Sequence, residues 1–369
     1  MKKISSIVIS ALLCLCLAGC GASGQTSQSE AAQTAAQESE TVSLEDVKFD
    51  LYKGEDGSVS QDIFAMDTYM TVKAYGDQAE EAVTASVNEI ERLDNLLSTG
   101  MQGSEIAQLN DAGGGAVSED TEYLIGRSLD LYQSTDGTFD IAIYPVMQLW
   151  GFPTQDYHVP DDEEIAQALS LADAAQISLD EENHTVSFGK TDMEIDLGGI
   201  AKGYTSSRIA EIFSSYGVTS GIVSLGGNVQ AIGSKTDGTP WKVGIQDPDD
   251  SSAYLGILSL TDKAAITSGG YERYFEEDGK TYHHIIDPAT GRPADSGVIS
   301  STVISSDGTL ADGLSTTLFI MGADKAFAYW RENSQDFDFI LEDEDGRLYV
   351  SEGIADSFDT DRGMTVVHP

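Results

Sequence analysis

All three cysteines of this 369-residue chain lie within its first twenty positions, at 14, 16 and 20. Residues from 21 onward can therefore form no disulfide, zinc ribbon or iron–sulfur cluster, and they hold no cysteine nucleophile. A fold built from them has to be held together by packed helices and strands. About 310 residues follow the N-terminal region, enough to bury a substantial core as one large domain or two closely packed lobes.

The N-terminus has the pattern of an exported, lipid-anchored protein. Lys2 and Lys3 precede an apolar run over residues 4–17, which is too short to span a bilayer and has the length of a secretory signal core. The run closes with Leu-Ala-Gly-Cys at residues 17–20, which favours acylation of Cys20 over a plain signal peptide. We predict a signal peptide at 1–19, the lipidated Cys20 and a flexible polar tether at 20–58, and the folded domain at 59–369.

The chain is strongly acidic. Its net charge is −42, and removing Lys2 and Lys3 with the signal peptide makes it −44. Such a surface is repelled by nucleic-acid backbones, so nucleic-acid binding is excluded as a main function. A site for an anionic substrate would have to contain its own positive charges.

Hydrophobic periodicity predicts helices and strands in mixed order, which places the chain in the α+β class. A strand is expected over residues 63–75, and a hairpin over 271–286 is expected to turn at Asp278-Gly279. Another strand pair is expected to turn at Asp345-Gly346. Helices are expected over residues 78–98, 104–109, 121–132, 161–171, 200–216, 310–321 and 325–331. Further strands are expected near 177, 186 and 195 and over 221–225, 229–232, 241–246, 255–260 and 264–268.

Several common catalytic motifs are absent from the sequence. The two Gly-Lys-Thr triplets, at 189–191 and 279–281, lack the glycine that a phosphate-binding P-loop places five residues earlier. The sequence has no HExxH, GxSxG or GxGxxG pattern. Zinc metalloprotease, α/β-hydrolase and Rossmann dinucleotide-binding readings therefore have no support.

Two glycine-rich clusters occur at the ends of predicted strands. In the first, Asp196 precedes Gly198-Gly199, and Lys202 lies in the first turn of the next helix. Backbone amides at such a turn can approach a phosphate, and a lysine there adds positive charge, although glycines at these junctions are about as often a packing device. The second cluster, residues 224–228, is by itself better explained as a tight turn.

Two further clusters carry side chains suited to chemistry. His283 and His284 are neighbours on a predicted strand, so their side chains should point to opposite faces, and one of them could face a site. Asp312 and Thr316 are spaced i and i+4 on a predicted helix and share a face. A carboxylate and a hydroxyl suit a hard cation such as Mg²⁺. Taken alone, helix capping by Asp312 is the simpler explanation.

Together, and in this order, these clusters resemble the ApbE family of FAD:protein FMN transferases. The resemblance runs from about residue 64 to residue 341. It is carried by MDT at 66–68, GTFD at 137–140, LWGF at 149–152, DLGGIAKGY at 196–204, SLGGN at 224–228, ITSGGYERYF at 266–275, HHIIDPATGRP at 283–293 and ADGLSTTLFIMG at 311–322.

The resemblance implies an ApbE-like two-lobed fold, with mixed sheets flanked by helices and FAD between the lobes, and it makes residues 59–369 the catalytic domain. It also implies Mg²⁺ held by the Gly199 carbonyl and the side chains of Asp312 and Thr316, with His284 as the catalytic base. Some members carry an acid where this chain has Ser315, which offers only a hydroxyl. The implied FAD contacts are Met66, Thr138, Phe139, Asp140, Asp196, Lys202 and Ile286.

The implied reaction splits FAD, releases AMP and joins FMN through a phosphodiester to a Thr or Ser hydroxyl of an extracytoplasmic protein. Membrane redox-pump subunits and secreted flavoproteins are the kinds of acceptor that the family suggests. Two alternatives stay open: an FAD pyrophosphatase that uses water as acceptor, and a lipoprotein that only carries FAD. Residues 312–317 also resemble the family's acceptor motif, with Thr317 at the modified position, but a helix inside the metal site makes self-modification unfavourable.

Overall fold

The structure is a computed structural model that describes residues 50–369. The predicted signal peptide and the predicted lipidation site at Cys20 lie outside the described residues. Of the predicted tether, residues 50–58 are described, and within them β1 (Tyr52–Lys53) pairs with β2 (Ser58–Ala65). Among the described residues, no helix has both the length and the apolar character needed to cross a membrane.

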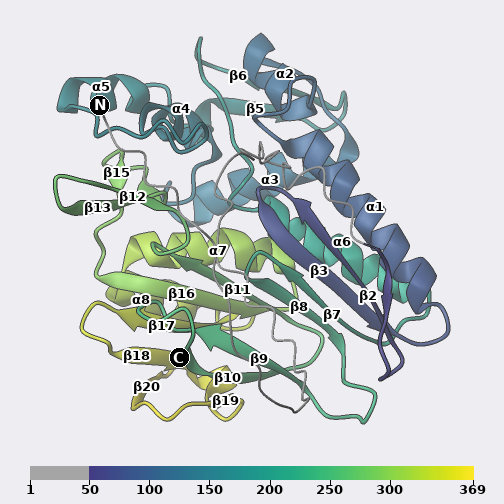
Figure 1. Cartoon of the computed structure of the whole chain (residues 1–369). Helices are drawn as coiled ribbons and strands as arrows, with labels where there is room; N and C mark the ends of the chain where they lie inside the picture. The colour runs from purple at the N-terminus through teal and green to yellow at the C-terminus, as the bar shows by residue number, and fades with distance from the viewer. Residues whose placement is uncertain (1–49) are drawn as a thin grey trace, which may run out of the picture. The chain divides into compact units, whose positions relative to one another are not determined.

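A ten-stranded sheet forms the centre of the fold (Figure 1). Neighbouring strands run antiparallel except for the last pair, which is parallel, so the sheet is mixed. In spatial order it consists of β1, β2, β3 (Thr68–Tyr75), β7 (Ser220–Leu225), β8 (Asn228–Gly233), β11 (Ala264–Gly269), β16 (Val298–Ser305), β17 (Asp338–Asp343), β18 (Leu348–Ser351) and β20 (Met364–Val367).

The two faces of this sheet are covered differently. Helices α1 (Ala79–Leu97), α6 (Ala201–Ser215), α7 (Gly308–Met321) and α8 (Ala323–Asn333) pack along one face. The other face packs against a small sheet of β9 (Trp241–Gln246), β10 (Tyr254–Leu260) and β19 (Phe358–Asp359). The short α9 (Glu352–Ala355) lies in the chain between β18 and β19. The alternation of strand side chains explains this arrangement, because Ile266 faces the helix-side core while its neighbour Ala265 faces the small sheet.

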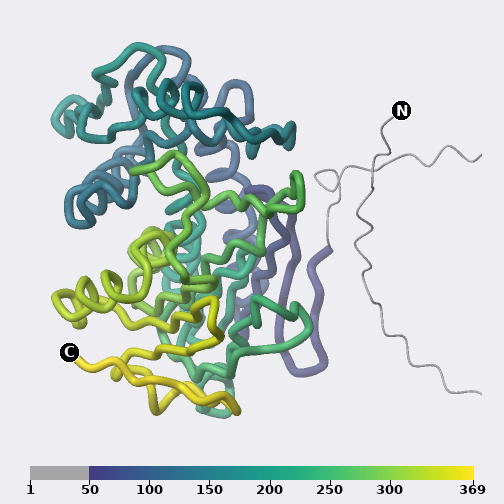
Figure 2. The backbone as a smooth tube through the Cα atoms, turned by 90° about the vertical axis from the view of Figure 1, so that its left-hand side faces the viewer, coloured from purple at the N-terminus to yellow at the C-terminus, as the bar shows by residue number. Residues whose placement is uncertain are grey.

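The remaining elements gather at one end of the large sheet (Figures 1 and 2). The hairpin of β12 (Tyr274–Glu277) and β13 (Lys280–His283) packs its aromatic side chains at the end of α4 (Tyr144–Leu149), since Phe275 and Tyr282 both contact Trp150. Besides this hairpin and α4, the elements at this end of the sheet are α2 (Glu105–Ala112), β4 (Gly114–Ala116), α3 (Glu119–Ser134), η2 (Ile141–Ile143), α5 (Asp162–Leu169), η3 (Ala174–Gln176), β5 (Ile177–Asp180), β6 (Thr185–Phe188), β14 (Ile286–Asp287) and β15 (Arg292–Pro293).

The α+β class is confirmed, and so are most of the elements expected from periodicity. The single strand expected over residues 63–75 is wrong, because Met66 and Asp67 both take positive φ angles and turn the chain between β2 and β3. No strand forms around residue 195. The buried strand β16 and helix α4 were not expected; β16 mixes serine and threonine with valine and isoleucine, so its sequence shows neither a clear alternation nor a continuous apolar run.

Candidate active site

Helices α6 and α7 cross where both have glycine. A methyl group added at Gly203 would lie 2.1 Å from the Gly308 carbonyl oxygen and 2.5 Å from Cβ of Asp312, so only glycine allows this approach. The backbone N–H of Gly203 donates to Oδ2 of Asp312 at 2.7 Å. First-turn N–H groups have no partner within their own helix, and Ile200 at the N-cap supplies none. Asp312 of α7 therefore caps α6 from a neighbouring helix.

The second oxygen of the same carboxylate is held by the glycine-rich cluster at residues 224–228. Gly226 and Gly227, with φ angles of +60° and +97°, form the turn between β7 and β8, as expected. Directly after the turn, Nδ2 of the buried Asn228 donates to Oδ1 of Asp312 at 3.0 Å. Asp312 is 5% exposed, and its burial raises the pKa of its carboxyl, an effect that the Lys202 charge opposes.

A group of hydroxyls lies one turn further along α7. Oγ of Ser268, near the end of β11, is 2.7 Å from Oγ of Ser315 and 3.1 Å from Oγ1 of Thr316. Ser315 is fully buried and also donates to the main-chain carbonyl of Asp312 at 2.8 Å, whereas Thr316 is half-buried. Residues from four of the motifs that carry the resemblance, at 196–204, 224–228, 266–275 and 311–322, thus meet at α7.

Phe139 and the loop that contains Asp196 and Gly199 complete the region. A methyl group added at Gly199 would lie 3.3 Å from the Phe139 ring, and one at Gly313 would lie 3.6 Å from the same ring, so Phe139 packs between both. Asp196 is partly buried and accepts the Gly198 N–H at 2.9 Å. Its burial raises its pKa, against the opposing charges of Arg273 and Lys202.

Lys202 adds positive charge to this region. It has no ion pair within 4 Å among residues 50–369, yet its charge lowers the pKa values of Asp196, Glu272, Asp312 and His284. Arg273 is a second cation, and its guanidinium lies 3.8 Å from Asp67 in the β2–β3 turn. The site therefore contains positive charges of its own, which an anionic substrate of this acidic protein requires.

The two histidines point in different directions, as predicted. His283 ends β13; its Nε2 contacts the Ala294 carbonyl at 3.1 Å and its ring meets Phe319 edge-on. His284 follows the strand and places Nδ1 3.2 Å from the Arg273 carbonyl. Because a carbonyl only accepts, Nδ1 carries the proton and Nε2 keeps a free lone pair. Burial, and then the charge of Arg273, lower the pKa of His284 to about 3, so the ring is neutral.

The other predicted FAD contacts are half-buried or buried, and some of their polar atoms already have partners. Both carboxylate oxygens of Asp140 already accept N–H groups, from Ala142 at 2.7 Å and Ala174 at 3.3 Å, and burial raises its pKa to about 6. The Ile286 side chain is 5% exposed and packs in the cluster around Trp150. Thr138 is half-buried, and the half-buried Met66 has its sulfur 3.9 Å from the Thr205 hydroxyl.

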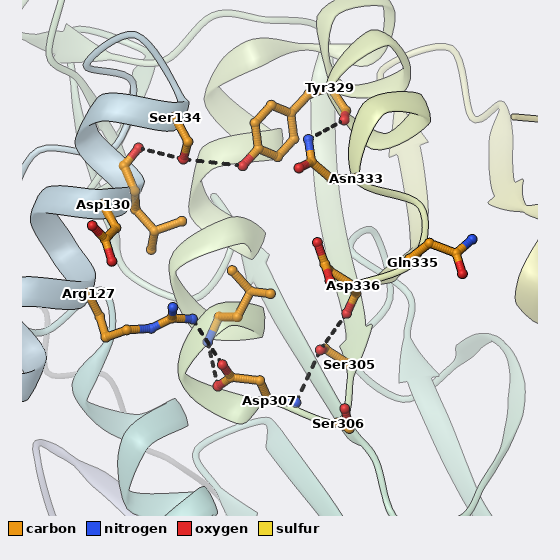
Figure 3. A pocket seen from close by; sticks show the side chains of 12 residues that line it. Arg127, Asp130, Ser134, Ser305, Ser306, Asp307, Tyr329, Asn333, Gln335 and Asp336 are labelled. Carbon is orange, nitrogen blue, oxygen red and sulfur yellow. Dashed lines mark hydrogen bonds and ion pairs between the residues drawn. The ribbon is translucent and has the colours of Figure 1, made fainter.

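A cavity of about 470 Å³ lies elsewhere, between α3, the start of α7 and the end of α8 (Figure 3). Arg127 and Asp307 form an ion pair there at 2.9 Å, and Ser134 contacts Tyr329 across it. None of the predicted site residues lines this cavity. The candidate site is therefore identified from the hydrogen bonds and charges around Asp312, and not from this cavity.

Within residues 50–369 no group of three or more His, Cys, Asp or Glu residues is placed to hold a metal ion. The predicted Mg²⁺ ligands include only one carboxylate and could not form such a group. Asn228, Ser268 and Arg273 were missed as site residues. All three lie in the motifs that carried the family resemblance, which was the signal available in the sequence.

Comparisons with known proteins agree with this arrangement. Residues 66–341 match the model of the ApbE family. An FAD:protein FMN transferase from Klebsiella pneumoniae is 35% identical over 267 residues, which cover 71% of this chain and 82% of that protein. One from Treponema pallidum is 33% identical over 311 residues, covering 78% and 85%.

Solved structures show the same fold. The ApbE protein of Thermotoga maritima superimposes with a TM-score of 0.77 at 33% identity and covers 84% of this chain and 99% of that one. The flavin transferase ApbE of Vibrio cholerae gives a TM-score of 0.73 at 29% identity, covering 81% and 99%. The predicted ApbE-like fold, with mixed sheets flanked by helices, is confirmed.

Proposed function

The chain belongs to the ApbE family of FAD:protein FMN transferases, and we propose that it splits FAD and joins FMN to a Thr or Ser hydroxyl of another protein. The observation that best supports this is the convergence on Asp312 of two amide donors from separate motifs, beside Thr316 and near Lys202. A buried carboxylate fixed in this way is suited to hold a charged group in one position.

The donor set fits Mg²⁺. Oδ2 of Asp312 accepts the Gly203 N–H, Oδ1 accepts the Asn228 amide, and the Lys202 backbone N–H is a further donor to this carboxylate. A carboxylate has about four lone-pair sites, so three donors leave one for a cation. The Thr316 hydroxyl and the Gly199 carbonyl add the neutral oxygens that Mg²⁺ accepts alongside water and phosphate. When bound, the ion would supply neutralisation of the diphosphate charge.

The chain's own residues account for the proton and the remaining charge. His284 is neutral and offers Nε2 as an acceptor, so it would take the proton of the acceptor hydroxyl. The hydroxyl oxygen forms a bond to the phosphorus on the FMN side, while the bond from that phosphorus to the bridging oxygen breaks and AMP leaves. Lys202 would stabilise the negative charge on the phosphate oxygens. FAD itself would lie between the lobes.

The proposed setting is extracytoplasmic, with the enzyme held on the membrane by lipid on Cys20. Its acceptors would then be proteins that face the same compartment, such as membrane redox-pump subunits or secreted flavoproteins. The attachment through Cys20 rests on the sequence of the N-terminal region, and the kind of acceptor rests on the family.

One experiment separates the transferase from its alternatives. Purified protein is mixed with FAD and Mg²⁺, with and without a peptide that carries the family's Asp-Gly-x-Ser-Ala-Thr motif, and AMP and peptide mass are measured. A transferase gives AMP together with a peptide heavier by FMN. AMP without peptide modification would indicate a pyrophosphatase, and FAD that is bound but intact would indicate a carrier.

A further inference from the structure

Three hydroxyl groups form a continuous chain between β11 and α7. Thr316 lies 3.1 Å from Ser268, Ser268 lies 2.7 Å from Ser315, and Ser315 lies 2.8 Å from the carbonyl oxygen of Asp312. Ser315 is fully buried, and the other two side chains are half-buried. The distances alone leave open which hydroxyl donates in the first two contacts.

The end of the chain fixes these directions. A hydroxyl has one proton to donate, and a main-chain carbonyl can only accept. Ser315 must therefore donate to the Asp312 carbonyl, so Ser268 must donate to Ser315. The proton of Ser268 is then used, and the contact with Thr316 requires Thr316 to donate.

The usual behaviour of a helical threonine shows why this matters. Such a hydroxyl often donates to the carbonyl four residues earlier, as Thr317 does to Gly313 at 2.7 Å and Thr205 does to Ala201 at 2.8 Å. For Thr316 that carbonyl belongs to Asp312, and the Ser315 hydroxyl already occupies it. Thr316 is thus directed to Ser268 instead.

We infer that Ser268 and Ser315 are positioning residues that fix the Thr316 hydroxyl as a donor toward β11, leaving its oxygen lone pairs free for a divalent cation. This inference rests on the proposed function. It gives Ser315 a role other than that of a metal ligand, because its hydroxyl is buried, donates to the Asp312 carbonyl and accepts from Ser268. Hydrogen bonds that orient a metal ligand in this way typically affect metal affinity about 10- to 100-fold.

Binding of Mn²⁺, measured by the loss of the free-ion signal in electron paramagnetic resonance, tests the inference without turnover. The measurement is made in the presence of FAD on the full chain carrying His284→Ala, so that transfer of FMN is blocked. Adding Ser268→Ala or Ser315→Ala should weaken Mn²⁺ binding about 10-fold or more. Adding Ser268→Thr, which keeps the hydroxyl, should stay within about threefold of the His284→Ala parent.

Thr317→Val is the matched control, since it removes a buried hydroxyl of the same helix that is outside the chain. It should lower stability but leave the Mn²⁺ affinity unchanged. Equal affinities for Ser268→Ala and the parent would overturn the inference, as would an equal loss in Thr317→Val. If the parent binds no Mn²⁺ at all, the metal assignment of the proposed function fails and the inference falls with it.

Discussion

Nδ2 of Asn228 donates to Oδ1 of Asp312 at 3.0 Å, across 84 residues of sequence. This bond joins the turn between β7 and β8 to the middle of α7. The Gly203 amide holds the other carboxylate oxygen, so three separate elements fix one side chain. Asp312 therefore has a structural role in addition to the proposed metal-binding role.

Replacing Asn228 with leucine should expose this dual role. The change keeps the side-chain size but leaves Oδ1 of a buried carboxylate without its donor, which typically costs about 1–3 kcal/mol. We expect the free energy of unfolding, measured by urea denaturation, to fall by that amount and transferase activity to fall with it.

Gln230→Leu is the control for this prediction. Gln230 is also buried on β8, but its amide donates to the Ala231 carbonyl and does not contact Asp312. It should lose stability while the activity of the folded protein is kept. A similar loss of activity in both variants would mean that the Asn228–Asp312 bond has no special role.

Removing the proposed ligands should raise the metal requirement, and Asp312→Ala should also lower stability because the Gly203 and Asn228 donors lose their acceptor. Asp312→Ala and Thr316→Val should lower transferase activity steeply and raise the Mg²⁺ concentration needed for half-maximal rate. Thr317→Val provides the comparison, because its hydroxyl bonds to Gly313 within the helix. Wild-type activity at low Mg²⁺ in both ligand variants would show that the metal assignment is wrong.

The burial of Thr317 also bears on self-modification. Its side chain is fully buried and its hydroxyl is already bonded, so it is poorly placed to receive FMN. Denatured protein should therefore show no added FMN mass at this residue. A mass increase that disappears in Thr317→Val would contradict this expectation.

Local patterns predicted the parts of the site better than their assembly. The periodicity of residues 200–216 and 310–321 was sufficient to locate α6 and α7, and the i, i+4 spacing placed Asp312 and Thr316 on one face. That Ser268 would lie beside Thr316 depends on β11 running next to β16 under α7. Strand order is a long-range property that no window of sequence contains.

Two further misses have local causes. The turn between β2 and β3 uses Met66 and Asp67 at positive φ. Such hairpin turns usually have Asn-Gly or Asp-Gly, so residues 66–67 carry no recognisable turn signal. Asn228 was interpreted only as part of a tight turn. That interpretation is confirmed, but the residue after a turn can also contact a neighbouring element.

The crossing of α6 and α7 should be intolerant of any side chain at Gly203. Gly203→Ala would place a methyl group 2.1 Å from the Gly308 carbonyl oxygen, which forces the helices apart and breaks the Gly203–Asp312 hydrogen bond. Overpacking of this kind typically costs about 1–3 kcal/mol or more, so thermal unfolding should occur at a clearly lower temperature. Gly100→Ala, where the nearest atom is 3.9 Å away and φ is not positive, should change stability little.

The proposed base should be recognisable by the direction of its effect on stability. The pKa of His284 is lowered from 6.5 to about 3, first by burial and then by the charge of Arg273, so the folded protein binds its proton less readily than the unfolded chain. The stabilising contribution of the neutral ring is fully present above pH 6.5 and is lost as the pH falls toward 3. Between pH 6.5 and pH 5 the loss should be about 1.5 kcal/mol.

Urea denaturation of the FAD-free protein at both pH values measures this loss. The wild type should lose about 1.5 kcal/mol more than His284→Gln, because the variant has no group to protonate at this position. As a control, a variant of the exposed His158, His158→Gln, should retain the full acid sensitivity of the wild type.

Transfer assays at pH 7.5 test the same residue by activity. His284→Gln should bind FAD and lose most activity, whereas His283→Gln should keep more of it, since the His283 ring packs on Phe319 and bonds to Ala294. Equal acid sensitivity of His284→Gln and wild type, together with retained transfer, would rule out His284 as the buried neutral base.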